Sequence, residues 1–173
     1  EAALQSFPID LDKYDNIFFD SITVASRLAL KWVKQQPEAH DKQGQFSNLK
    51  AYGMLGQELM NWFVHLQHTK DKNIWFVGLL EKETDDLGQA HWNPQMEGSK
   101  AGKELPGIVD QVITMQEITI QKDEKKTKHR AFICQKLNKW GYPAKDRSGC
   151  LNQVEPAHLG KLIEDEDLSR FIL

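Results

Sequence analysis

Two carboxylates each follow a run of apolar residues, where they could serve metal or nucleotide chemistry. Asp20 comes directly after Asn16–Phe19, and Glu81 comes after Asn73–Leu80. A short continuous apolar run is typical of a strand buried on both faces, as in a parallel sheet. Because ligands of open α/β sheets bind outside the carboxyl ends of the strands, Asp20 is placed to hold a Mg²⁺ that bridges nucleotide phosphates. If the two strands are neighbours, Glu81 lies beside Asp20, where a polar side chain positions an attacking water or senses the γ-phosphate.

Each carboxylate also has a simpler interpretation. Apolar runs that end in Asp-Ser are common, and Asp20 or Ser21 then caps the helix that follows. Glu81 is in the same way a carboxylate that happens to follow an apolar run. The residues by themselves leave both interpretations open.

Two cations lie close together in the turn Pro143–Gly149. Lys145 and Arg147 are two residues apart, so in a strand-like segment their side chains point to the same face. Two cations on one face suit a phosphate, which could belong to a DNA backbone or be the γ-phosphate of a nucleotide bound by a neighbouring subunit. The alternative is a basic turn that is simply solvated.

One glycine-rich stretch, Gly98–Glu104, is similar to the phosphate loop G-x-x-x-x-G-K-[ST]. It is one residue too short, and Glu104 stands where a hydroxyl would bind Mg²⁺. No strong strand precedes it, and Leu105-Pro106-Gly107 is not expected to continue a helix. We therefore predict that this stretch is no phosphate loop, so ATP binding lacks its main structural element within this sequence.

Two weaker candidates involve histidine and tryptophan. His65 and His68 are three residues apart on a predicted helix, a spacing that can chelate a metal, but no third ligand is evident and surface histidines fit as well. Trp92 and Trp140 lie in loop-like segments and are the tryptophans that could stack on bases, with ordinary packing as the alternative.

The surrounding pattern predicts an α/β fold with a mostly parallel sheet. Apolar residues recur at three- and four-residue steps over 49–68, which indicates a long helix with one buried face. A strand, helix and strand in this order form a right-handed crossover with parallel strands. Two later strands around a basic turn favour an antiparallel hairpin at the C-terminal end of the sheet. The predicted strands are 16–19, 73–80, 111–120 and 130–137, and the predicted helices are 22–35 and 49–68. Residues 87–110 are predicted to be a loop, with or without one short strand at His91–Met96.

Composition limits the class of protein. The chain has 173 residues, 40% of them hydrophobic, and a net charge of −3, which excludes a polybasic coating protein but leaves local basic runs able to meet DNA. Two cysteines make neither a metal-type pair nor a disulfide framework. No apolar run approaches the length of a membrane span and no signal peptide is visible, so we expect a soluble, cytoplasmic protein without membrane contact.

Taken in order, several stretches resemble one family. The run Tyr14–Thr23 resembles the Walker-B strand of phage-encoded RecA-like ATPases, the AAA-type family that includes the Sak-like single-strand annealing proteins. The similarity continues through Tyr52-Gly53 and the strand that ends at Leu80-Glu81-Lys82, and then takes in Glu104–Asp110 and Ala144–Gly149. The order of these motifs is more specific than any one of them.

The resemblance implies a RecA-like P-loop NTPase core, with Mg²⁺-dependent ATP hydrolysis between subunits of a homo-oligomeric ring or filament. It also implies recombination or replication on single-stranded DNA. Carried over to this sequence, Asp20 is the Walker-B carboxylate linked to Mg²⁺. Ser21, the next residue, is expected to bind the nucleotide beside it. Glu81 takes the place of the polar sensor, and Lys145 and Arg147 match the pair that reaches the neighbour's nucleotide.

The family's phosphate loop precedes the Walker-B strand, whereas this sequence opens at Glu1 without an initiator methionine. We therefore expect residues 1–173 to be a single RecA-like ATPase domain cut short upstream of the Walker-B strand, with ATP hydrolysis a property of the full-length protein. The alternative is a non-catalytic DNA-binding or oligomerisation module that retains the fold. An unrelated α/β hydrolase or nuclease that uses Asp20 and Glu81 with a metal has no supporting motif.

Overall fold

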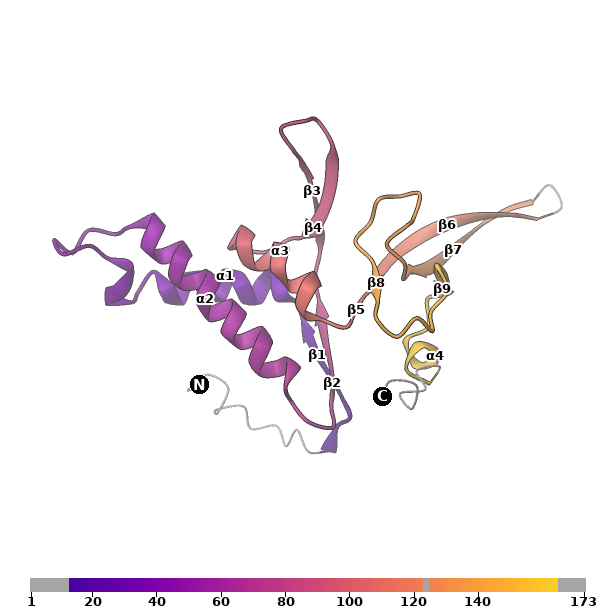
Figure 1. Cartoon of the computed structure of the whole chain (residues 1–173), viewed down its shortest axis with the longest axis horizontal. Helices are drawn as coiled ribbons and strands as arrows, with labels where there is room; N and C mark the ends of the chain where they lie inside the picture. Colours follow the sequence, from indigo (N-terminus) through magenta and orange to yellow (C-terminus); the bar gives the residue numbers. More distant parts are fainter. Residues whose placement is uncertain (1–12, 123–124, 165–173) are drawn as a thin grey trace. The chain divides into compact units, whose positions relative to one another are not determined.

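The computed structural model of the chain describes residues 13–122 and 125–164. Its elements, labelled in Figure 1, form two compact units. Unit 1 contains the described residues up to 79 together with 95–101, and unit 2 contains 80–94 and the described residues from 102 onward. The expectation of one RecA-like domain over the whole chain stays a prediction.

A parallel pair of strands forms the sheet of unit 1, as predicted. Strand β1 (Asn16–Asp20) pairs with β2 (Asn73–Val77) in the register that sets Phe19 opposite Phe76. The second strand is shorter than predicted, because it ends at Val77 and does not reach residue 80.

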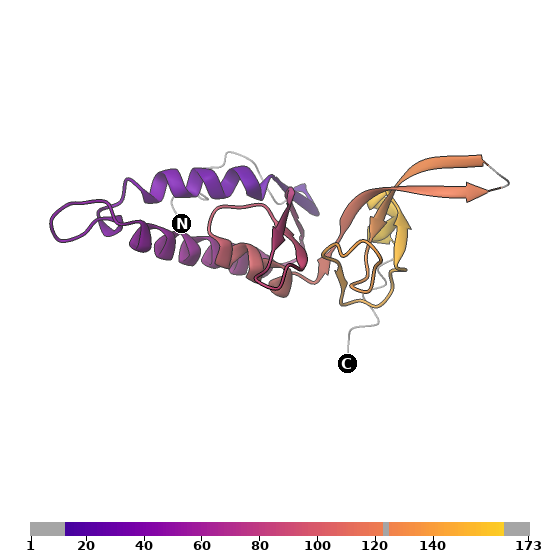
Figure 2. The ribbon, with the colours of Figure 1, turned by 90° about the horizontal axis from the view of Figure 1, so that it is seen from above.

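Two helices and a short 3-10 turn connect these strands. Helix α1 (Ile22–Val33) and helix α2 (Asn48–Gln67) match the predicted helices, and the turn η2 (Pro37–Ala39) lies between them. Figure 2 shows α1 and α2 side by side. The buried face of α2 follows the predicted periodicity through its middle and C-terminal half; its buried residues are Ala51, Leu55, Leu59, Phe63 and Leu66.

The aromatic core of unit 1 covers one face of the strand pair. Phe19 and Phe76 pack against Trp62 and Phe63 of α2, with ring centroids 5.1 Å apart for both Phe19–Trp62 and Phe63–Phe76. Phe18 points to the other face and is 48% exposed. The expectation of strands buried on both faces is therefore wrong for β1, because Phe18 and Asp20 share the other face and both are exposed.

The buried face of α1 agrees only in part with its apolar pattern. Of the apolar residues that predict an amphipathic helix over 22–35, Leu30 is buried, whereas Val24, Leu28 and Trp32 are exposed. The helix instead buries a face that mixes apolar and hydroxyl residues, because that face meets α2 and the residues that follow β2. The buried residues of α1 are Ile22, Thr23, Ser26, Leu30 and Val33.

Unit 2 begins with an antiparallel hairpin of β3 (Leu80–Thr84) and β4 (Ala90–Pro94). Helix α3 (Ser99–Ile108) follows, with its first residues in unit 1 and the rest in unit 2. The prediction that residues 87–110 form a loop is thus wrong over α3, whereas β4 overlaps the short strand considered at 91–96. The expectation that Leu105-Pro106-Gly107 does not continue a helix is also wrong, because α3 contains all three residues and ends at Ile108.

The predicted C-terminal antiparallel hairpin is present in unit 2. Strand β6 (Thr114–Lys122) pairs antiparallel with β7 (Lys125–Ile133), and both strands extend further into the predicted basic turn than expected. Two shorter pairings complete the sheets of this unit: β5 (Gln111–Val112) with β8 (Lys145–Asp146), and β9 (Val154–Pro156) with the end of β7.

Helix α4 (Leu159–Glu164) closes the core of unit 2. Burial raises the pKa of the Cys134 thiol to about 11, with a smaller contribution in the same direction from Glu155 and Asp146, so this cysteine is an inert core residue. The core cluster consists of Phe132, Cys134, Leu151 and Leu162, with Ile113 and Leu159 packed against it.

The fold is mixed α/β, as predicted, but the described residues do not show a mostly parallel sheet. The β1–β2 pair is parallel, whereas the other described pairings are antiparallel and small. Across residues 13–122 and 125–164, no helix has the length and apolar character needed to cross a membrane.

Candidate functional site

Asp20 lies at the carboxyl end of β1, where the sequence predicts a ligand-binding carboxylate. The next residue, Ser21, is the N-cap of α1, and its Oγ accepts a hydrogen bond from the Val24 N–H at 3.3 Å. The helix-cap interpretation therefore applies to Ser21. Asp20 is exposed, and within residues 13–122 and 125–164 its side chain has no hydrogen bond or ion pair. The Asp20 carboxylate is thus available to a ligand.

Two buried hydroxyls fix the start of α1 beside the end of β2. Thr23 Oγ1 accepts a hydrogen bond from the Leu79 N–H at 3.2 Å. Ser26 Oγ accepts one from the Glu97 N–H at 2.9 Å and donates to the Thr23 carbonyl at 3.0 Å. Because buried polar groups are stable only when they are bonded, these contacts hold the carboxyl edge of the sheet against the helix start.

Gly78 makes that close approach possible. A Cβ atom at this position would lie 2.8 Å from Ile22 Cγ1, closer than real Cβ contacts allow. The glycine therefore brings the backbone after β2 directly against the first turn of α1. Sequence reasoning did not single out Gly78, Thr23 or Ser26; a glycine inside the apolar run 73–80 was the available signal.

Glu81 does not follow β2 directly. It is the second residue of β3 in unit 2, where its Cα is paired with that of Asn93. The side chain is half-buried, and within the described part of the chain it has no hydrogen bond or ion pair. The predicted pairing of Glu81 with Asp20 stays a prediction.

Lys145 and Arg147 both reach the C-terminal end of α3. The Lys145 Nζ donates to the carbonyls of Pro106 at 3.0 Å and Gly107 at 3.1 Å, and to that of Val109 at 2.6 Å. As the i and i+2 spacing predicts, the two side chains meet the same segment. The last carbonyls of a helix have no partner within the helix, and a lysine here satisfies them and complements the helix dipole.

Arg147 binds the residue that ends this segment. Its Nη1 donates to Asp110 Oδ1 at 2.7 Å, and its Nη2 donates to the Gly107 carbonyl at 3.2 Å. The structure thus joins two of the stretches on which the family resemblance rests, Glu104–Asp110 and Ala144–Gly149.

Burial lowers the pKa of Lys145, and the charge of Arg147 lowers this pKa further, while Asp110 acts in the opposite direction.

Replacing Lys145 with methionine is expected to destabilise unit 2 by about 1–3 kcal/mol, because three carbonyls lose their donor while the apolar stem is kept. Urea unfolding followed by circular dichroism measures the change. Lys136→Met is the matched control, since Lys136 is exposed and its side chain makes no hydrogen bond or ion pair with another described residue. Equal stability of the two variants would contradict the structural role of Lys145.

Asp146, between the two cations, organises the following turn. Its carboxylate accepts hydrogen bonds from the Ser148 N–H at 2.9 Å and the Leu151 N–H at 3.0 Å, and also from Ser148 Oγ and Gln111 Nε2. Burial raises the pKa of Asp146, but the hydrogen bonds from Ser148, Leu151 and Gln111 outweigh it and hold the pKa below 3.8. The turn over Pro143–Gly149 was predicted from the sequence, but the role of Asp146 in it was not.

Replacing Asp146 with asparagine is expected to cost about 1–3 kcal/mol at neutral pH, because an amide cannot accept at both oxygen positions. A lowered pKa in the folded state stabilises the protein above the unfolded value of 3.8, and this stabilisation is lost as the pH falls through the folded value. The stability difference between wild type and Asp146→Asn should therefore shrink in acid. Thermal unfolding at neutral pH and well below pH 3.8 measures it, and a difference that does not change with pH would contradict the assignment.

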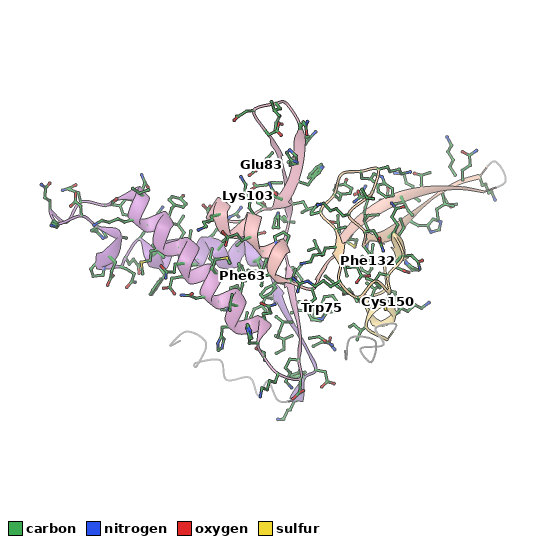
Figure 3. All side chains as sticks on the ribbon, viewed as in Figure 1. Phe63, Trp75, Glu83, Lys103, Phe132 and Cys150 are labelled. Carbon is green, nitrogen blue, oxygen red and sulfur yellow. The ribbon has the colours of Figure 1, made fainter. Side chains whose placement is uncertain are left out.

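A polar hollow of about 370 Å³ lies between the β3–β4 hairpin and α3. Figure 3 labels Glu83 and Lys103 in it, whose Oε2 and Nζ are 3.7 Å apart. Glu83 also accepts a hydrogen bond from Asn93 Nδ2 at 2.9 Å, and His91 Nε2 lies 2.9 Å from Asp85 Oδ2. The charged residues, the histidine and the asparagine of this hollow are therefore paired with one another.

The weaker sequence candidates have structural roles. Helix α3 begins at Ser99, directly after Gly98, so no open loop between two glycines is present that could surround a phosphate. His68 Nδ1 lies 2.7 Å from the Val64 carbonyl, and the described residues contain no group of three or more His, Cys, Asp or Glu that could bind a metal. Trp92 packs against Tyr142, with ring centroids 5.3 Å apart.

A family model described as an AAA domain matches residues 2–148. Since this match covers well over half of the 173 residues, the chain belongs to the AAA domain family. Such domains are of the ATPase type, and membership implies nucleotide binding, typically of ATP with Mg²⁺. No curated protein and no solved structure matches the chain.

Proposed function

We propose that the full-length protein is a RecA-like ATPase of the phage or prophage type. It couples Mg²⁺-dependent ATP hydrolysis to recombination or replication on single-stranded DNA, and it acts as a homo-oligomeric ring or filament. The observation that carries the ATPase part is the family match, combined with Asp20 at the carboxyl end of a parallel strand, where its carboxylate has no partner among the described residues. The DNA and oligomer parts extend the family resemblance.

The residues at this strand end fit Mg²⁺. The metal prefers carboxylate and water oxygens, and Asp20 presents an exposed carboxylate that is not used elsewhere among the described residues. Ser21 is adjacent and its hydroxyl already caps α1, so it is better suited to hold the start of the helix than to bind the metal. Asp20 would position Mg²⁺ directly or through water, and the bound metal would neutralise the charge that develops on the phosphates.

Lys145 and Arg147 have a place in this proposal as the cations that reach the nucleotide of a neighbouring subunit. Carbonyl oxygens and the Asp110 carboxylate bind them within their own chain. A phosphate presents similar oxygens with more negative charge, so it would exchange with these partners. The proposal therefore requires the two side chains to change partners when subunits and nucleotide meet.

The second candidate function is a non-catalytic DNA-binding or oligomerisation module. One observation favours it: the described residues contain no phosphate loop, and α3 occupies the stretch that most resembles one. In this case Lys145 and Arg147 serve only to end α3, and the polar residues of unit 1 serve only to fix α1.

Nucleotide turnover in the full-length protein distinguishes the two candidates. We expect phosphate release from ATP that requires Mg²⁺, is abolished by a chelator, and rises when single-stranded DNA is added. The concentration dependence of the rate tests whether subunits cooperate. A full-length protein that binds single-stranded DNA but neither binds nor hydrolyses ATP would contradict the ATPase and leave the non-catalytic module.

A further inference from the structure

The β6–β7 hairpin extends beyond the core of unit 2 (Figure 1). Strand β9 pairs only with residues 131–133, at the base of the hairpin next to the core. No other described strand of the unit pairs with the part of the hairpin beyond this base. Residues 125–130 are all exposed. A two-stranded hairpin of this length buries little surface of its own, so its sequence is free to serve a partner.

One face of this hairpin carries a regular row of cations. Lys126, Lys128 and Arg130 are at alternate positions of β7, so their side chains share one face and are spaced by about 7 Å along the strand. Farther along the same face, Phe132 is buried in the core of unit 2. The row therefore begins where the core ends and continues outward.

The opposite strand balances little of this charge. The residues paired with the three cations are Gln121, Thr119 and Glu117. Glu117 contacts Lys128 diagonally, with Nζ and Oε1 2.8 Å apart, and this contact lowers the pKa of Glu117 and raises that of Lys128. Both side chains are exposed, so the pair contributes little to stability and can be opened by a stronger anion.

We propose that this face of the β6–β7 hairpin binds the phosphate backbone of single-stranded DNA. The inference rests on the DNA part of the proposed function and assigns it to a surface. A row of evenly spaced cations follows a polyanion, and the sequence 114–133 has a net charge of +2 in a chain whose total is −3. The aromatic residue of this sequence, Phe132, is in the core, so the contact is to phosphates and is independent of base sequence.

Salt-dependent binding of a dye-labelled oligothymidylate to the chain tests this assignment. In the variant Lys126→Gln/Lys128→Gln/Arg130→Gln, we expect the slope of log K against log salt to decrease in magnitude by about 2, since each phosphate contact on a single strand contributes about 0.7. The matched control is Lys31→Gln/Lys34→Gln/Lys42→Gln, which removes the same charge from exposed positions of unit 1 and should keep the wild-type slope. Glu117→Gln releases Lys128 from its partner and should tighten binding.

Each other outcome overturns a defined part of the inference. If wild type binds and the triple hairpin variant keeps the wild-type slope, the hairpin assignment fails while DNA binding by the protein stands. If wild type does not bind DNA at all, the DNA part of the proposed function fails as well. Binding of polyglutamate as tightly as oligothymidylate would indicate an acidic protein partner, and duplex DNA bound as tightly or more tightly would overturn the assignment to single strands.

Discussion

Replacing Asp20 with asparagine in the full-length protein is expected to reduce ATP turnover by at least about 100-fold. The reason is electrostatic, because the amide keeps the shape of the side chain but loses the charge that positions Mg²⁺. Asp20 is exposed and has no partner among the described residues, so the melting temperature should stay close to that of wild type. Steady-state phosphate release at saturating ATP and Mg²⁺ measures the effect.

A matched control lies just before the same strand. Asp15 lies directly before β1, at its amino end, and is also exposed. Ligands of parallel sheets bind at the carboxyl ends of the strands, so Asp15→Asn should retain wild-type turnover. Normal turnover by Asp20→Asn, or an equal loss in both variants, would show that Asp20 is not the metal-linked carboxylate.

Truncating Phe63 to alanine is expected to destabilise unit 1 by about 3–5 kcal/mol. This side chain is fully buried, and its ring lies 5.1 Å from Phe76 and 5.3 Å from Trp62, measured between centroids. The variant loses the apolar contact area and leaves a cavity between α2 and the strand pair. Urea unfolding followed by the fluorescence of the unit 1 tryptophans measures the loss.

The neighbouring residue is the control for this prediction. Val64 is 42% exposed on the opposite side of α2, so Val64→Ala should change stability by no more than about 0.5 kcal/mol. A similar small effect for Phe63→Ala would mean that α2 does not pack on the β1–β2 pair through this residue.

Elements whose signal is local were predicted well from the sequence. Helix α2 and the β6–β7 hairpin agree with their patterns because each repeats one periodicity over many residues. The parallel pairing of β1 and β2 was also predicted, since two apolar runs joined by helices permit few other arrangements. Helix α3 was missed because its Pro106 argues locally against a helix, and the Lys145 that stabilises its end is 39 residues away.

The candidate site likewise has features that the sequence predicted and features that only distant contacts determine. The sequence alone determined which residue types can do chemistry and, for Asp20, that a carboxylate ends a strand. The tertiary structure decided that Glu81 lies in a different hairpin and that Lys145 and Arg147 bind the end of α3.

The physical reason is the distance along the chain over which each kind of interaction acts. Periodicity and capping act over a few residues and can be read along the chain. The partner of an exposed cation or carboxylate is selected by a competition among groups that the sequence separates widely, as with the 37 residues between Arg147 and Asp110. Family membership and the strand-end carboxylate are therefore properties of the sequence, whereas the partners of the cations are properties of the folded chain.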